Sequence, residues 1–116
     1  MLATALFACL VVKVYDGDSF TCQGGTRVRL AAIDAPELGK CRRGRVCAPG
    51  NPRASKAALS KLALGRTVRC RKTGTTWGRV SAWCSAGKLD LSCAQFRAGH
   101  AVRLAQFDRK LELCRR

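Results

Sequence analysis

Residues 11–33, "VVKVYDGDSFTCQGGTRVRLAAI", contain three strand-like runs separated by two turns, and the predicted architecture is built outward from them. Apolar, β-branched and aromatic residues dominate residues 10–15 and 20–22, and apolar residues alternate with arginine at the start of residues 26–33. The tripeptides DGD and QGG between the runs have the residues that tight turns prefer. The segment therefore predicts two consecutive hairpins.

A helix signal follows in residues 51–65. Asn51 can cap a helix, Pro52 suits its first turn and Gly65 ends it. The apolar stripe of this helix is predicted to consist of Ala54, Ala58 and Leu62. Three further strand-like runs come after it, at residues 67–72, 78–84 and 89–91.

The last quarter of the chain predicts two more helices. Ser92 and Gln95 have the spacing of a capping box, which opens a helix that ends near Gly99, and a third short helix is predicted over residues 108–114. About five short and largely antiparallel strands with inserted helices are typical of one architecture. We therefore predict an α+β, mainly β fold, a five-stranded OB-like Greek-key barrel with two to three helices.

The DGD turn allows two interpretations. Asp and Gly are ordinary hairpin residues, so its carboxylates could simply be solvated turn formers. Alternatively, Asp16 and Asp18 could place oxygen ligands side by side for a hard cation. The turn alone does not decide between them.

Length and charge narrow the class of protein. The 116 residues are 47% hydrophobic, which suits one compact domain with a modest core. Lys and Arg total 22 against 7 Asp and Glu, so the formal net charge is +15. Such an imbalance attracts polyanions at long range, and nucleic acid is the first candidate. Composition alone leaves anionic lipid, or charge that serves only solubility, as alternatives.

Eight cysteines are many for this length, and their even number fits a disulfide framework in an oxidising compartment. We therefore expect export, to the periplasm or the medium. Structural zinc is disfavoured because the chain has no C-x-x-C pair and one histidine, His100, which we interpret as an ordinary helix or loop residue. Cys41 and Cys47 close a short loop and are the pair we expect first; sequence does not assign the others.

Residues 1–8 are interpreted as an N-terminal segment and residues 9–116 as a single domain. The segment is apolar, lacks the positively charged start of a secretory signal and is too short to span a bilayer. It is either the remnant of a longer leader or the ragged beginning of the first strand. The expectation of export therefore rests on the cysteines, and no stable membrane insertion is expected.

A second charged motif is "RVRLAAIDAPE", residues 27–37. Arg29 lies within the predicted strand and Asp34 lies at its end, while Pro36 fixes the chain so that Glu37 follows close behind. An aspartate at a strand end opposite the DGD turn could complete a Ca²⁺ site. Alone, "DAPE" is an ordinary turn.

The third motif is "TTWGRV", residues 75–80, in which Gly78 turns the chain between Trp77 and Arg79. Alone it is a hairpin with a solvated arginine. The three motifs together place acids, two arginines and a candidate base at strand ends of one small barrel. That combination suits phosphodiester cleavage, because a metal neutralises charge, arginines donate to phosphate oxygens and a carboxylate orients water.

The motifs occur in the order DGDS, VRLAAIDAPE, ASKAAL and WGRV. Over roughly residues 9–107, this order resembles the staphylococcal nuclease (thermonuclease) family. The resemblance implies a five-stranded OB-like barrel with three helices and calcium-dependent cleavage of DNA and RNA that leaves 3′-phosphate ends. It implies Ca²⁺ as the cofactor, and we expect single-stranded or frayed nucleic acid as the substrate and a monomeric protein.

Position by position, the resemblance implies roles for individual residues. The metal ligands would be Asp18, Asp34 and the backbone carbonyl of Ala35. The catalytic residues would be Arg29 and Arg79 as a phosphate-binding pair and Glu37 as a general base or water-ordering group. Asp16 resembles the turn former. Two carboxylates and a carbonyl could also accept manganese or magnesium.

Further residues are candidates for substrate binding. Trp77 stands where the best-known family member has a tyrosine, and it could stack on a base. Two further pocket tyrosines of that member align with Ala105 and, loosely, with Phe107. Arg42 and Arg43, in the basic run "KCRRGRVC", could belong to a surface that attracts polyanions.

Two other functions compete with an active nuclease. A non-catalytic nucleic-acid-binding module on the same fold would be expected to lack part of the acidic and arginine set, which this chain has in full. A cationic protein that acts on membranes is disfavoured, because the predicted helix is rich in alanine and only weakly amphipathic.

Overall fold

The computed structural model describes residues 5–39, 41 and 44–115 of the chain. Its strands are β1 (Leu6–Asp16), β2 (Ser19–Cys22), β3 (Arg27–Leu30), β4 (Ile33–Asp34), β5 (Thr67–Thr76), β6 (Arg79–Ala86), β7 (Leu89–Asp90) and β8 (Val102–Arg103). Its helices are α1 (Pro52–Ala63), α2 (Leu91–Arg97) and one 3₁₀ turn, η1 (Ala105–Phe107). The first strand thus begins earlier than predicted.

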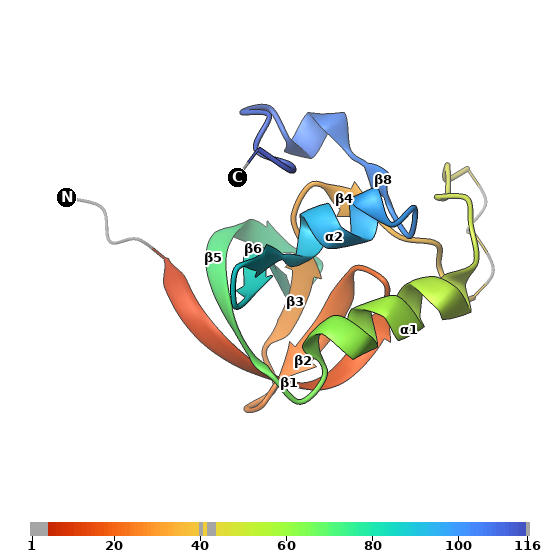
Figure 1. The fold of residues 1–116 in the computed structure, drawn as a ribbon. Helices are drawn as coiled ribbons and strands as arrows, with labels where there is room; N and C mark the ends of the chain where they lie inside the picture. Colours follow the sequence, from red (N-terminus) through yellow and green to blue (C-terminus); the bar gives the residue numbers. More distant parts are fainter. Residues whose placement is uncertain (1–4, 40, 42–43, 116) are drawn as a thin grey trace.

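The main sheet has the strand order β3-β2-β1-β5-β6-β7, and β3 also pairs in parallel with β6. This pairing closes β1, β2, β3, β6 and β5 into a barrel, and the short strands β4 and β8 pair beside it (Figure 1). Helix α1 packs against β1, and α2 packs against β6 and α1. The predicted OB-like α+β fold is confirmed.

Inward-facing strand residues fill the barrel. The register between β1 and β2 is irregular between Val11 and Lys13 and again between Val14 and Asp16. These irregularities let Val11 and Val14 both face the core although they are three residues apart. The core also contains Phe20 and Leu30, each fully buried. The outward-facing strand positions and the loops at the strand ends are therefore left to carry the charged groups.

Helix α1 confirms its predicted ends but not its predicted face. Asn51 accepts a hydrogen bond from the Ala54 amide, and Pro52 opens the helix. The buried residues are Ser55, Leu59 and Ala63, one position beyond the predicted stripe. The stripe was wrong because Ser55, a polar residue, is buried with its hydroxyl donating to the carbonyl of His100 at 2.7 Å.

Helix α2 begins two residues earlier than predicted, and its cap is a different side chain. Asp90 accepts from the Cys93 amide at 2.9 Å, whereas Ser92 is buried and donates to the carbonyl of Ala31 at 2.7 Å. The capping box predicted from Ser92 and Gln95 is therefore wrong. Both side chains bind parts of the fold that are distant in sequence.

The third helix, predicted over residues 108–114, is also wrong: these residues form turns. The carboxylate of Asp108 accepts from the amides of Glu112 (2.7 Å) and Leu113 (3.4 Å), and from Arg103 Nε at 2.9 Å. Those amides would donate to backbone carbonyls in a helix, so the side chain replaces helical hydrogen bonding. Leu111 (φ 54°) adds a left-handed residue that no regular helix accommodates.

Four disulfides connect all eight cysteines: Cys9–Cys22, Cys41–Cys47, Cys70–Cys84 and Cys93–Cys114. The predicted Cys41–Cys47 pair is confirmed. Two of the bridges join neighbouring barrel strands, one closes the loop before α1 and one joins α2 to the C-terminal turns. This number of disulfides fits an oxidising compartment. In the part of the chain that is described, every helix is too short or too polar to cross a membrane.

Replacing Asp108 with Asn tests the C-terminal turns. Burial raises the pKa of Asp108, but hydrogen bonds from Arg103 and from the amides of Glu112 and Leu113 outweigh it, so the pKa lies below its ordinary value of 3.8. A lowered pKa adds stability above pH about 4 that is lost as the pH falls through the folded-state pKa. We expect Asp108→Asn to lower the free energy of unfolding by about 1–3 kcal/mol at neutral pH.

Urea unfolding at a series of pH values measures this effect. The difference in the free energy of unfolding between wild type and Asp108→Asn should be largest at neutral pH and should become smaller as the pH falls below about 4. A difference that stays constant across that range would show that the charge of Asp108 does not hold the turns.

Candidate active site

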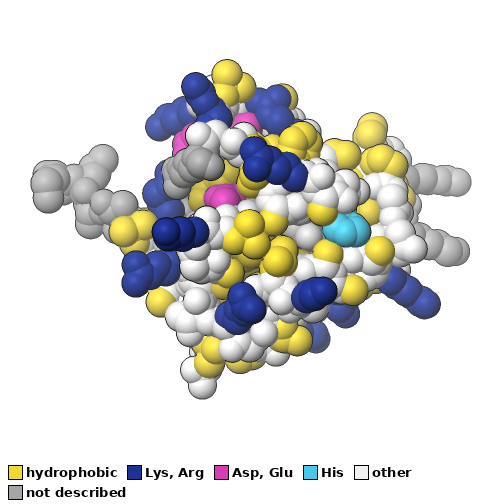
Figure 2. Space-filling view, in the orientation of Figure 1, with side chains coloured by type: hydrophobic (Ala, Val, Ile, Leu, Met, Phe, Trp, Pro, Cys, Tyr) yellow, Lys and Arg dark blue, Asp and Glu magenta, His cyan; other side chains and the backbone are white. Residues whose placement is uncertain are grey.

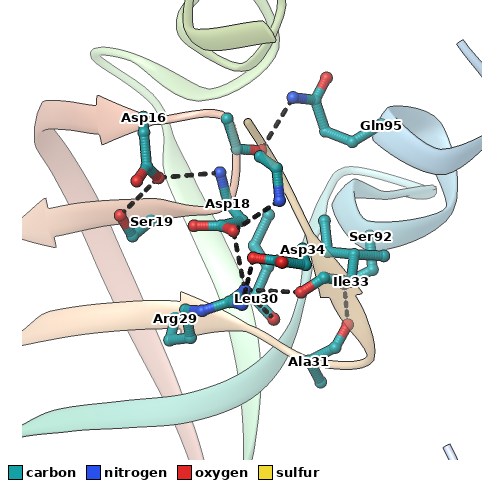
Figure 3. Close-up of polar contacts among 12 residues, drawn as sticks. Asp16, Asp18, Ser19, Arg29, Leu30, Ala31, Ile33, Asp34, Ser92 and Gln95 are labelled. Carbon is teal, nitrogen blue, oxygen red and sulfur yellow. Dashed lines mark hydrogen bonds and ion pairs between the residues drawn. The ribbon is translucent and has the colours of Figure 1, made fainter. Parts of the chain in front are cut away.

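Asp16 shapes the turn between β1 and β2. Its Oδ1 accepts from the amide of Asp18 at 3.1 Å and from the hydroxyl of Ser19 at 2.7 Å (Figure 3). Burial raises the pKa of Asp16, but hydrogen bonds with the Asp18 carboxyl, the Ser19 hydroxyl and the Asp18 amide outweigh it, and the net pKa lies below its usual value. The side chain of Asp16 is thus engaged within the turn, and the second aspartate is the one that contacts the rest of the site.

Gly17 allows this turn to lie close to helix α1. A Cβ at this position would lie 1.7 Å from Ser55 Oγ and 2.9 Å from Ala35 Cβ. Gln95 of α2, fully buried, donates from Nε2 to the carbonyls of Gly17 (2.8 Å) and Ser55 (3.0 Å). The turn is therefore clamped between two helices.

Arg29 lies between two carboxyl groups, those of Asp18 and Asp34, which together are called the acidic group. Its Nη1 is 3.1 Å from Asp18 Oδ2 and its Nη2 is 3.3 Å from Asp34 Oδ1 (Figure 3). Nη1 also donates to the carbonyls of Ile33 (2.7 Å) and Leu30 (3.2 Å). The Arg29 side chain is only 14% exposed. One guanidinium thus joins the β1–β2 turn to the end of β3 and to β4.

The environment of Asp18 is the most unusual in the site. Burial raises its pKa to about 8, and Arg29 offsets only part of that rise. Its Oδ2 also accepts from the Ala35 amide at 2.8 Å. At neutral pH this carboxyl therefore holds a proton unless a further positive charge lies beside it.

Arg45 forms ion pairs with Glu37 and Asp34. It belongs to the loop that the Cys41–Cys47 disulfide closes. One nitrogen of its guanidinium pairs with Glu37 Oε1, and the other lies 3.6 Å from Asp34 Oδ1. Asp34 therefore lies between two guanidinium groups. Sequence reasoning missed Arg45; the one available signal was its position in the basic run between two cysteines.

Arg79 and Trp77 lie in the wall of an adjoining cavity of about 210 Å³. Its lining also includes Ser19, the residue after Asp18, so the cavity begins next to the acidic group. Phe107 lies on η1 and is 68% exposed. Arg42 and Arg43 fall outside the described residues, and their predicted role stays a prediction.

The donor set can be compared with the needs of a divalent cation. Among the residues described, no three Asp, Glu, His or Cys side chains lie close enough to form a metal cluster. Two carboxylates, Asp18 and Asp34, converge on Arg29. This set fits a hard cation that keeps water or a phosphate oxygen among its ligands. The carbonyl of Ala35 stays a predicted ligand.

The sequence was compared with known proteins. No family model matches it. Over 104 residues, 85% of this chain, it is 32% identical to a protein of Haemophilus influenzae described as an uncharacterized endonuclease. The chain spans about half the length of that protein, 53%.

Substituting Gly17 with Ala tests the clamp on the turn. The added Cβ has no space between Ser55 and Ala35, so we expect Gly17→Ala to lower the free energy of unfolding by about 1–3 kcal/mol or more. Gly39→Ala is the matched control, because its Cβ would meet no atom within 4 Å and its backbone is not left-handed. Chemical denaturation of both variants gives the comparison, and equal losses would contradict the close packing at Gly17.

Proposed function

We propose that this protein is a cation-dependent nuclease that hydrolyses phosphodiester bonds in DNA and RNA. The observation that carries the proposal is the buried Arg29 guanidinium held against two carboxylates at a strand end of an OB-like barrel. A phosphodiesterase needs this pairing of donors for phosphate oxygens with oxygen ligands for a cation. The likeness to a protein described as an endonuclease supports the same conclusion.

We propose Ca²⁺ as the cation, with Asp18, Asp34 and the Ala35 carbonyl as its protein ligands. When bound there, Ca²⁺ would supply positive charge to the phosphate and polarise its oxygens. The carboxylates of Asp18 and Asp34, when both are ionised, repel a phosphodiester, and the positive charge of the cation would offset that repulsion.

Arg29 and Arg79 are assigned to the phosphate. Arg29 has five N–H donors, and its forked guanidinium can bind phosphate oxygens while keeping contacts with the carboxylates. Arg79, in the adjoining cavity, approaches from the side of β6. Donors fixed in this way by the barrel stabilise the charge that develops on phosphorus oxygens during attack by water.

Glu37 is assigned to the attacking water, as a base or as a group that orders it. Its carboxylate is held by Arg45, which fixes its direction toward Asp34. Water forms the new bond to phosphorus, the bond to the 5′ oxygen breaks, and the leaving oxygen takes up a proton. Cleavage in this direction leaves 3′-phosphate ends.

The surface suits a polyanionic substrate. Figure 2 shows Lys and Arg side chains around the visible face and acidic side chains at only a few places. A net charge of +15 raises the rate of encounter with nucleic acid and makes binding sensitive to salt. We propose an exported monomer that acts on single-stranded or frayed nucleic acid.

The test is cleavage of single-stranded DNA and RNA by the oxidised protein with Ca²⁺ and with chelator. We expect calcium-dependent fragments with 3′-phosphate ends. Arg79→Gln should lower kcat/KM by about 10²–10³-fold, the loss typical of removing one transition-state donor. Arg66→Gln, an exposed arginine in the turn before β5, is the control and should cleave like wild type. Salt-sensitive binding without cleavage under any divalent ion would instead identify a non-catalytic binding module.

Arg45→Gln tests whether the loop arginine competes with the cation. Removing its charge leaves Asp34 and Glu37 with less positive charge nearby. We expect the dissociation constant for Ca²⁺, measured by calorimetry without nucleic acid, to fall severalfold, because a charge within about 4 Å contributes on the order of 1 kcal/mol at an exposed site. A weaker affinity in the variant would show that Arg45 instead holds the ligands in place.

A further inference from the structure

The outer face of the barrel carries a row of polar residues beside Arg29. Lys13 of β1 pairs with Thr21 of β2, and Thr21 pairs with Arg27 of β3. In the parallel pair of β3 and β6, Val28 is opposite Val80, so the preceding residues, Arg27 and Arg79, are also neighbours. Opposite residues in paired strands point to the same side. The row therefore crosses four strands, a width of about 14 Å.

This row continues directly from the acidic group. Ser19 and Arg29 form the neighbouring pair on the same face, two residues along β2 and β3. The cavity of about 210 Å³ lies over the row, and its lining includes Tyr15, Thr21, Arg27, Trp77 and Arg79. A nucleic-acid strand bound at Arg29 could therefore extend along this concave, basic surface.

Trp77 has no role in the fold that explains its position. It is 91% exposed, and its backbone is left-handed (φ 50°), as is that of Gly78 (φ 75°). Two left-handed residues are what a two-residue β-hairpin turn requires, and Asn-Gly is the favoured sequence there. A large aromatic residue in this conformation costs stability of order 1–3 kcal/mol and buries almost nothing in return. Such strain points to a ligand.

Tyr15 supplies a second aromatic ring to the lining of the cavity. It is 57% exposed at the end of β1. The ammonium of Lys13 lies 5.4 Å from the centroid of its ring. This cation–π contact holds the ring in place beside one cation of the row, Lys13.

We propose that these residues, Lys13, Tyr15, Thr21, Arg27 and Trp77, form an outer-face strip that binds the unpaired nucleotides adjoining the cleaved phosphodiester. Arg27 and Lys13 bind phosphates, and Tyr15 and Trp77 stack on bases. Stacking accepts every base because each has a flat face, whereas bases in a duplex have no free face. The strip therefore selects single strands without selecting sequence. This inference rests on the proposed nuclease function.

The experiment uses the fluorescence of Trp77. The oxidised protein is titrated with single-stranded hexathymidylate in chelator, so that binding is measured without cleavage. We expect the oligonucleotide to quench the exposed Trp77, while the other tryptophan, Trp83, is buried and serves as a constant background. Arg27→Gln and Tyr15→Ala should each raise the dissociation constant about tenfold, within the range for one lost phosphate contact or one lost stacked base.

The two variants should differ in their dependence on salt. Arg27→Gln should reduce the slope of log affinity against log salt by about one, and Tyr15→Ala should leave it unchanged. Arg66→Gln, which removes an arginine away from the strip, is the matched control and should bind within about twofold of wild type.

Trp77→Asn separates binding from folding. It should keep or raise the melting temperature, because Asn suits the left-handed turn, and should weaken binding of the oligonucleotide, measured by calorimetry because the variant lacks the fluorescent reporter. If Arg27→Gln and Tyr15→Ala bind with wild-type affinity while calcium-dependent cleavage is intact, the proposed binding strip is wrong but the proposed nuclease function is not. A wild-type protein that neither binds nor cleaves would overturn both.

Discussion

The fold around the acidic group depends on one buried guanidinium. Arg29 contacts two carboxylates, Asp18 and Asp34, and donates to two backbone carbonyls at the end of β3. Removing it would leave Asp18 buried without its counter-ion and Asp34 with Arg45 alone, and losing one partner of a buried pair costs several kcal/mol. Lysine would not replace it, because its single ammonium nitrogen cannot contact both carboxylates in the way that the two terminal nitrogens of the arginine do. The same contacts that close this part of the barrel therefore assemble the site.

The rest of the structure holds the Arg29 guanidinium and the two carboxyl groups in position. A chain of 116 residues with a net charge of +15 has a modest core and strong internal repulsion. Disulfides offset part of this loss of stability, because they restrict the conformations of the unfolded chain. Cys9–Cys22 joins the two strands that lead into and out of the DGD turn, and Cys41–Cys47 closes the loop that carries Arg45. Cross-links thus lie on both sides of the acidic group.

Features with a local cause were predictable from sequence. The hairpins of residues 11–33, the ends of α1 and the Cys41–Cys47 loop follow from turn residues, caps and spacing within a few positions. The barrel followed from the number and order of short strands. The grouping of Asp18, Arg29 and Asp34 was suggested by their positions near strand ends of one small barrel, and the resemblance to a family then assigned each of them a role.

Most of the failures involve side chains whose partners are distant in sequence. Ser55, Ser92 and Gln95 are polar residues that became buried because each donates to a backbone carbonyl at least 40 positions away. Asp108 replaced a predicted helix by taking amides that a helix would have used. Arg45 could not be singled out from the other arginines of its loop before the loop was placed. Tertiary hydrogen bonding therefore outweighed local propensity at the two serines and the glutamine, and local side-chain hydrogen bonding outweighed it at Asp108.

Charge balance explains why a cation and a phosphodiester would bind to this site together. Burial raises the pKa of Asp18 to about 8, and the neighbouring Asp16 adds to that rise. A divalent cation that displaced a proton from Asp18 would raise the net charge of the site by one. A phosphodiester brings one negative charge and would offset that gain. Without the cation, the same phosphodiester would add a negative charge to a largely buried site that already holds carboxylates, which is costly. Each ligand would therefore favour binding of the other.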